Sequence, residues 1–307
     1  MSIFAAGLWA RYKRPMSTTF VHVALDQQLP LTCSRGGTCC HGNRIGLNPW
    51  ELARLAHARG LTPATFRERF TSEGGIVLRF DGPADDRGLP ACSQYLGGDD
   101  PGCTVHDARP LVCRLYPLGR RQQGERTGYI HLGSTFPCLS GCPAVASLPK
   151  RTVAAYLESQ DVSAAETAHD AYLEIMQHLA DAALVLLLDS GLAKSGDRLT
   201  LRRWRELGAG PAELRVKTLG PTWLDRLMTP LIEGPLDEPA VFAAHHHEAL
   251  QAAAQDELAS LADIPSLRDA SSLMMAMALH LGRALGAESA PLAAHWIATA
   301  RAHGARD

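Results

Sequence analysis

The cysteines of this 307-residue chain are confined to one stretch of the sequence. All eight lie between Cys33 and Cys142, and the rest of the chain contains none. Residues 33–40 form the densest group, which ends in the adjacent pair Cys39 and Cys40. Thiolate sulfur is a soft ligand that favours zinc or iron–sulfur clusters over calcium or magnesium. The distribution therefore predicts a discrete thiol-rich metal site.

Three roles compete for these thiols: structural disulfides, inert packing and metal ligation. Disulfide frameworks belong mainly to small secreted domains, whereas this chain is long enough to bury real cores. Residues 1–15 also lack the apolar segment and the small-residue cleavage site of a secretory signal. We therefore expect a cytoplasmic protein with reduced cysteines, and we favour metal ligation over the other two roles.

Charge and hydropathy restrict the partners. The net charge is −2 and no run of Lys and Arg stands out, so the basic surface of a nucleic-acid-binding protein is missing. The apolar stretch at residues 182–188 is far shorter than the roughly 20 residues of a membrane span. The sequence predicts no nucleic-acid partner and no membrane insertion. A protein substrate or partner stays open, and the oligomeric state is not indicated.

Composition changes near residue 145. The chain before this point is rich in Gly, Pro and Cys, and the chain after it is Ala- and Leu-rich with helical periodicity. We predict an N-terminal extension at residues 1–29, a cysteine-cluster metal-binding domain at residues 30–147 and a helical domain packing on it at residues 148–307. The expected fold class is mainly α, with a small, irregular, metal-stapled α+β N-terminal part and an all-α C-terminal part.

Local signals place several elements in the N-terminal part. The sequence Asn-Pro-Trp-Glu at residues 48–51 and Thr62-Pro63 each predict a helix start. Residues 76–80 read as a strand, and residues 115–132 read as a hairpin.

The C-terminal part has its own helix signals. A capping box at residues 163–166 predicts a long helix, and further helices are expected at residues 239–261, 266–285 and 289–303. The density of Gly and Pro predicts an irregular crossover at residues 208–239. The triplet at residues 245–247, His-His-His, is expected on a solvated helix face, because it lacks the pattern of a metalloprotease helix.

The spacing of the cysteines bears on the metal. Zinc sites commonly use C-x2-C pairs, which this chain lacks, whereas ligands of iron–sulfur clusters arrive from several loops. His41 and His106 lie close to cysteines and are candidate substitute ligands. The candidate metal ligands are Cys33, Cys39, Cys40, Cys92, Cys103, Cys113, Cys138 and Cys142.

Two motifs carry a resemblance to a known family. The segment at residues 33–40 and the run Arg-Pro-Leu-Val-Cys-Arg-Leu-Tyr-Pro at residues 109–117 resemble the YkgJ-like cysteine-cluster family, described as a zinc- or iron-chelating domain. The cluster region of flagellin lysine N-methylase is related to it. The family's opening motif is C-x2-C-x2-C-C, and Gly36 stands here in place of its second cysteine. The resemblance covers roughly residues 30–145 and extends weakly to residues 153–160.

The closing motif suggests residues around the cofactor. An iron–sulfur centre bound by thiolates is anionic, so Arg109 and Arg114 are expected to donate charge-assisted hydrogen bonds to its sulfurs or to nearby carbonyls, with Tyr116 packing the adjoining loop. The alternative is that both arginines are ordinary surface residues.

The sequence favours a cytoplasmic metal-binding protein with a [4Fe–4S] cluster and a redox or catalytic role at that centre, and Zn²⁺ is the alternative metal. Two further hypotheses remain. One is a protein-lysine methyltransferase resembling the flagellin enzyme, which would use S-adenosylmethionine, and the other is a zinc-stapled interaction module. The sequence identifies no catalytic residue. If the protein is an enzyme, the two classes that the sequence suggests are an iron–sulfur oxidoreductase and an S-adenosylmethionine-dependent protein N-methyltransferase.

Overall fold

The protein is described by a computed structural model. The described residues are 21–31, 37–98, 102–123, 126–131, 149–232 and 235–307. Contacts divide the chain into two compact units, each discontinuous in sequence. The cysteine unit comprises Met1–Ile45 and Phe80–Ser163, and the helical unit comprises Gly46–Arg79 and Ala164–Asp307. The five cysteines among the described residues all belong to the cysteine unit.

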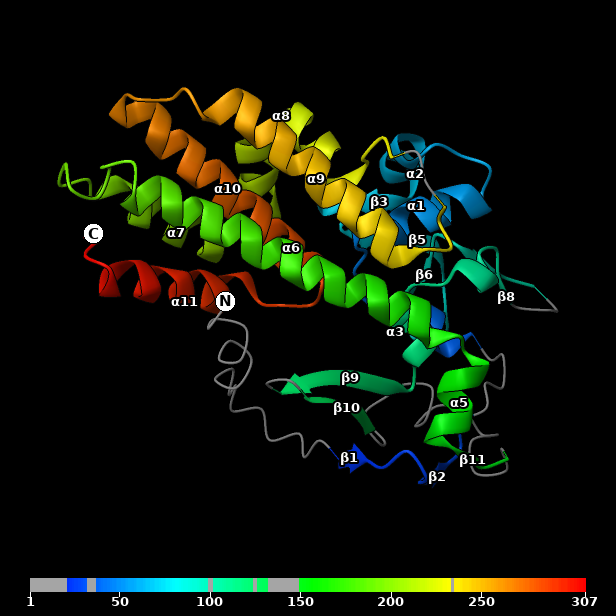
Figure 1. Ribbon diagram of the computed structural model, residues 1–307. Helices are drawn as coiled ribbons and strands as arrows, with labels where there is room; N and C mark the ends of the chain where they lie inside the picture. The colour runs from blue at the N-terminus through cyan, green and yellow to red at the C-terminus, as the bar shows by residue number, and fades with distance from the viewer. Residues whose placement is uncertain (1–20, 32–36, 99–101, 124–125, 132–148, 233–234) are drawn as a thin grey trace. The chain divides into compact units, whose positions relative to one another are not determined.

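Short antiparallel strand pairs make up much of the cysteine unit. β9 (Leu118–Gln123) and β10 (Arg126–His131) pair as the predicted hairpin, and β1 (Val21–Val23) pairs with the other edge of β10 (Figure 1). Three further pairs join β2 (Gln28–Leu29) to β11 (Arg151–Thr152), β5 (Phe80–Ala84) to β6 (Pro90–Cys92), and β7 (Tyr95–Leu96) to β8 (Gly102–Cys103). The short helices of this unit are η1 (Thr38–Cys40), η3 (His106–Ala108), α3 (Leu111–Leu115) and α5 (Val153–Ser159).

The first segment of the helical unit begins at the predicted helix start, where the structure shows a capping box. The Glu51 N–H donates to Asn48 Oδ1 at 2.9 Å, and the Asn48 N–H donates to Glu51 Oε2 at 3.0 Å. These bonds satisfy backbone donors that a helix start leaves without partners. The elements of this segment are α1 (Pro49–Ala58), α2 (Pro63–Phe70), β3 (Thr71–Ser72), η2 (Glu73–Gly75) and β4 (Val77–Leu78).

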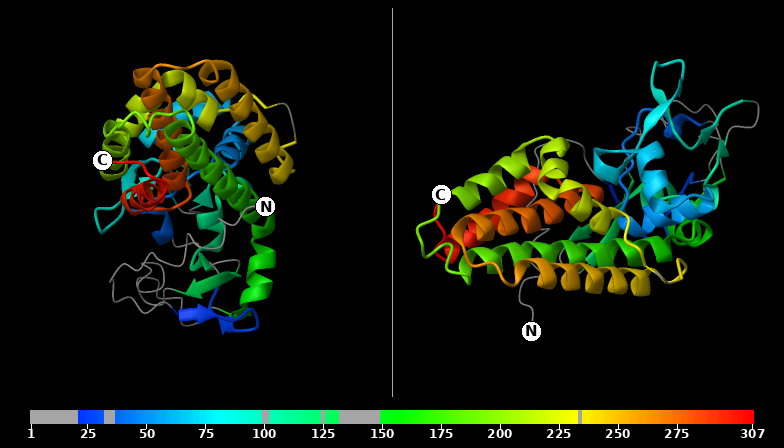
Figure 2. Two further views of the ribbon diagram at one scale, coloured as in Figure 1. Left: turned by 60° about the vertical axis from the view of Figure 1, so that its left-hand side comes forward. Right: turned by 90° about the horizontal axis from the view of Figure 1, so that it is seen from above.

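The second segment of the helical unit consists of long helices. α6 and α9 run alongside each other, joined by a hydrogen bond between Tyr172 and His246 (Figure 2). α10 packs against α7 and α8, and α7 also packs against α11. The bounds are α6 (Val162–Leu188), α7 (Leu199–Ala209), α8 (Ala212–Met228), α9 (Pro239–Leu258), α10 (Ile264–Ala284) and α11 (Ser289–Ala302).

The irregular crossover predicted at residues 208–239 is wrong in its first half, which is occupied by α8. Pro211 occupies the N-cap position of this helix, and Gly220 (φ 64°, ψ 171°) with Pro221 divides the helix in two at a kink. Gly208 lies in α7, where an added Cβ would come within 2.4 Å of the Ala293 Cβ on α11. The glycines and prolines therefore mark a close helix contact, a cap and a kink, which composition alone does not distinguish from a loop.

The predicted fold class is confirmed: small strands occur in the N-terminal region, and most helices lie in the C-terminal part. The domain boundaries at residues 29/30 and 147/148 stay a prediction. Contacts group the chain differently, because residues 46–79 belong with the C-terminal helices. For example, the Trp50 indole N–H donates to the Leu236 carbonyl at 3.0 Å, and Trp50 is 1% exposed.

One described helix, α6, is long and apolar enough to cross a membrane by length and composition, which is weak evidence by itself. Three of its side chains, Tyr172, Ala168 and Ala183, are completely buried in the protein. Of the apolar window of α6, 39% is buried inside the protein.

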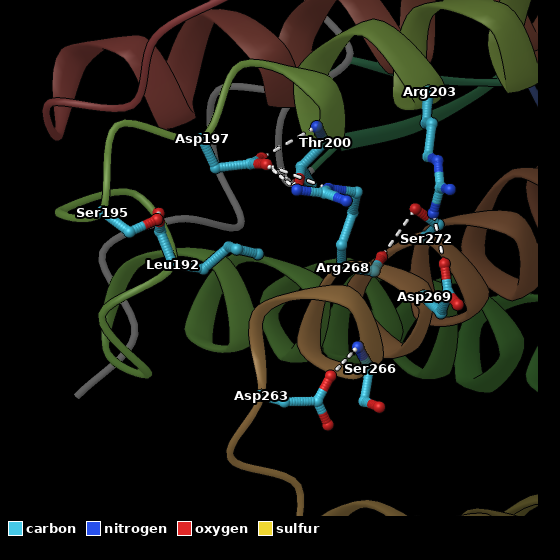
Figure 3. Close-up of polar contacts among 10 residues, drawn as sticks. All are labelled: Leu192, Ser195, Asp197, Thr200, Arg203, Asp263, Ser266, Arg268, Asp269 and Ser272. Atoms are coloured by element: carbon cyan, nitrogen blue, oxygen red, sulfur yellow. Dashed lines mark hydrogen bonds and ion pairs between the residues drawn. The ribbon is translucent and has the colours of Figure 1, made fainter.

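The helical unit contains a buried ion pair that holds the start of α7. The Asp197 carboxylate, 1% exposed, accepts from the Thr200 N–H at 3.0 Å and from the Thr200 hydroxyl at 2.6 Å (Figure 3). Its other oxygen accepts from Arg268 Nε at 2.9 Å and Nη2 at 2.6 Å, which ties α7 to α10.

Replacing Asp197 with alanine is expected to lower the free energy of unfolding by about 3 kcal/mol, because the change leaves a largely buried guanidinium without its carboxylate. Asp269→Ala is the matched control, since the Asp269–Arg203 pair joins the same two helices but is solvent-exposed (Figure 3). Its loss should cost less than about 1 kcal/mol. Urea denaturation measures the free energy of unfolding of both variants. Equal losses would contradict the claim that the buried Asp197–Arg268 pair stabilises the protein more than the exposed Asp269–Arg203 pair.

Candidate metal centre

Five of the predicted cysteine ligands lie in the described part of the cysteine unit. Cys39 and Cys40 end η1, and the other three lie on β6, β8 and α3, as Cys92, Cys103 and Cys113. Cys33, Cys138 and Cys142 lie outside the described residues. Cys40, Cys92, Cys103 and Cys113 form no disulfide.

The turn that carries Cys39 is fixed by local contacts. Gly37 adopts φ 67°, and a Cβ there would lie 2.5 Å from the Tyr95 hydroxyl, so only glycine is accommodated. The Gly37 carbonyl accepts from the Cys40 N–H at 2.9 Å and contacts His41 Nδ1 at 2.9 Å. Asn43 Nδ2 donates to the Cys39 carbonyl at 2.6 Å. His41 is thus engaged with backbone at one ring nitrogen.

Strand pairing brings further cysteines to this turn. An isolated β-bridge joins His41 to Ala91, the residue before Cys92. The Gln94 N–H lies 3.5 Å from Cys92 Sγ and points to it as a donor. β7 begins three residues after Cys92 and pairs with β8, which places Cys103 opposite Tyr95. These backbone contacts join segments that are distant in sequence.

The thiols interact electrostatically across these segments. Burial raises the pKa of Cys113 well above its usual value, and the charges of Cys92, Cys103 and Cys39 raise it further. Burial also raises the pKa of Cys92 to about 11, with Cys103 contributing, and it raises the pKa of Cys103. The Arg109 charge acts in the opposite direction on Cys103 and Cys113. Because the charges of Cys39, Cys92 and Cys103 act on Cys113, we refer to these four residues as the four-thiol group.

The chemistry of this group suits a soft metal centre. Four thiolates close together repel one another, and a bound cation removes that cost and lowers their pKa values. Within the described ranges, no three His, Cys, Asp or Glu side chains form a closed cluster around one ion. Cys39 Sγ and Cys40 Sγ are 4.0 Å apart. Sulfur ligands therefore suit zinc or iron, but the described side chains do not surround a single ion in this arrangement.

The two motif arginines take different places. Arg114 is 4% exposed, so the surface alternative is wrong for this residue. Its guanidinium donates to backbone carbonyls, including Arg109 O at 2.8 Å and Gln160 O at 2.6 Å. Arg109 is half-buried, and it donates to His106 O at 2.9 Å and to Gln160 Oε1 at 3.0 Å. Tyr116 is half-buried and precedes Pro117 through a cis peptide bond.

Sequence reasoning did not assign roles to Tyr156 and Gln160, which contact the closing motif from α5. The Tyr156 hydroxyl donates to the carbonyls of Arg114, at 3.2 Å, and Tyr116. The available signal was the weak extension of the family resemblance to residues 153–160. Their partners lie 40 or more positions away, so spacing along the chain does not identify them.

Residues 32–129 match the CxxCxxCC family model, whose description is "Putative zinc- or iron-chelating domain". The resemblance inferred from the two cysteine motifs is thus confirmed for these residues. No curated protein and no solved structure matches the chain. The family and the four-thiol group together support metal binding as the function of this region.

Proposed function

We propose that this chain is a cytoplasmic protein that binds a [4Fe–4S] cluster through Cys39, Cys92, Cys103 and Cys113. The observation that carries the proposal is the strand pairing that joins the segments of Cys39, Cys92 and Cys103, together with the charges of these three thiols that act on Cys113. The iron atoms of a cluster are separated in space, so they accept ligands from several loops better than a single zinc ion does. Cys33, Cys138 and Cys142 remain candidates for additional ligands.

The residues around the thiols have defined tasks in this proposal. The cluster supplies electron transfer or Lewis-acid activation of a substrate. The positive charge of Arg109 offsets the negative charge of the ligated thiolates. The Gln94 N–H directed at Cys92 Sγ makes the kind of hydrogen bond that raises a cluster's reduction potential. A protein partner or substrate would receive or supply the electrons.

Anaerobic purification followed by metal and sulfide analysis and visible absorption spectroscopy tests the proposal. We expect iron and acid-labile sulfide in equal amounts, with a broad absorption band that bleaches on reduction with dithionite. Stoichiometric zinc with no visible absorption would reject the cluster. That result would instead support the zinc-stapled interaction module, which the family description also allows.

A further inference from the structure

Arg114 follows Cys113 directly in α3 and is anchored to two distant segments of the cysteine unit. Its Nε and Nη2 donate to the carbonyls of Arg109 and Asp107, which precede the helix. Its Nη1 donates to the carbonyl of Gln160 at 2.6 Å, just after α5. The planar guanidinium therefore links the chain before Cys113 to the chain after α5.

α5 contacts the same helix through a second group. Tyr156 is 5% exposed, and its hydroxyl lies between the carbonyls of Arg114 and Tyr116, both just after Cys113. Gln160 Oε1 accepts from Arg109 Nη2 at 3.0 Å. Backbone and side chains on both sides of Cys113 are thus held by one short helix.

Backbone carbonyls of Arg109, Asp107 and Gln160 surround the buried charge of Arg114. Asp161 Oδ2 lies 3.9 Å from Arg114 Nη1, and the Asp161 side chain is 73% exposed. An exposed pair at this distance contributes little. The planar guanidinium presents donors at fixed angles to three carbonyls, those of Arg109, Asp107 and Gln160, and a lysine ammonium does not supply this geometry.

We propose that Arg114, Tyr156 and Gln160 are positioning residues, which orient the Cys113 thiol toward the other members of the four-thiol group. This inference rests on the proposed function, because it requires that Cys113 is a metal ligand. Tyr156 and Gln160 lie beyond the matched residues 32–129, so the metal site of this chain includes a helix outside its family domain.

Cobalt(II) titration of the metal-free full chain under anaerobic conditions tests the proposal, with affinities measured by competition with a chelator. Arg114→Lys and Tyr156→Phe are expected to weaken cobalt binding about 10- to 100-fold and to change the thiolate-to-cobalt absorption band, as loss of outer-shell partners does. Gln160→Ala keeps its backbone carbonyl and should have a smaller effect. Arg151→Lys, at an exposed arginine that donates to Ser159 Oγ, is the matched control and should bind as wild type does.

Thermal unfolding of each metal-free variant separates positioning from stability. A lower unfolding temperature with unchanged cobalt affinity and spectrum in all three variants would overturn the inference, because the residues would then be structural only. If Arg114→Lys does not fold, Tyr156→Phe and Gln160→Ala decide the question by the same criterion. Wild-type protein that binds neither cobalt nor iron would reject the proposed function, and the inference with it.

Discussion

Replacing Cys113 with serine is expected to reduce bound metal to less than about a tenth of the wild-type content and to destabilise the cysteine unit. Serine oxygen is a poor ligand for a soft metal, and this thiol interacts with the three other members of the four-thiol group. Cys39→Ser, Cys92→Ser and Cys103→Ser should behave in the same way. Metal analysis and thermal unfolding of anaerobically purified variants measure both effects.

Cys40→Ser provides the matched control, because Cys40 is adjacent to Cys39 in η1 and its thiol is of the same type. Cys40 is not among the thiols whose charges act on Cys113, so this variant should keep most of its metal. Equal losses in the Cys39 and Cys40 variants would show that the four-thiol group is wrongly chosen. Full metal content in all four ligand variants would reject the metal site itself.

Acidification from about pH 6.5 to about pH 5 is expected to lower the free energy of unfolding of the helical unit by about 3 kcal/mol, about 1.6 kcal/mol from each of two buried histidines. Burial lowers the pKa of His246 to about 4 and that of His280 to about 3. For His280 the Arg215 charge lowers the pKa further. The unfolded chain binds protons below pH 6.5 that the folded chain does not, so stability falls with pH until the folded-state values are reached.

The two histidines differ in their partners. His246 Nε2 donates to the Arg226 carbonyl at 2.9 Å, and Nδ1 accepts from the Tyr172 hydroxyl at 2.9 Å, a pattern that needs the neutral ring. The ring of His280 is also buried, and its contact with the Gly74 backbone raises its pKa only against the larger effect of burial. The solvated face predicted for the triplet at residues 245–247 is therefore wrong for His246, which is fully buried.

His280→Leu is expected to remove about half of the pH dependence and to keep or raise stability at neutral pH, since a buried polar ring in weak contact with the Gly74 backbone is replaced by an apolar side chain. His246→Leu should lose about 2–3 kcal/mol at neutral pH, because it leaves the Tyr172 hydroxyl without its acceptor. His57→Gln, on the exposed side of α1, is the control and should leave the pH profile unchanged. Urea denaturation at several pH values measures the stability of all three variants. An unaltered pH profile in His280→Leu would contradict the claim that His280 contributes to the pH dependence.

Features that depend on neighbouring residues could be predicted from the sequence. The capping residues Asn48 and Glu51 make the predicted bonds, since a helix start is satisfied by groups within one turn. The long helices after residue 160 follow from apolar periodicity, and the hairpin β9–β10 from two strands flanking a polar turn. The cysteine motif identified the family from residue types and spacing alone.

Features that depend on contacts between distant segments were decided only by the tertiary structure. Residues 46–79 join the C-terminal helices because side chains such as Trp50 and Phe66 are buried there, and composition does not indicate the partner of an apolar face. The bridge between His41 and Ala91 and the pairing of β7 with β8 select which cysteines meet. The sequence determined that this protein has a thiol-rich metal-binding domain, because soft ligands and local hydrogen bonds are encoded by residue type and spacing. The tertiary structure decided which thiols, arginines and histidines are buried together, because burial depends on segments far apart in the chain.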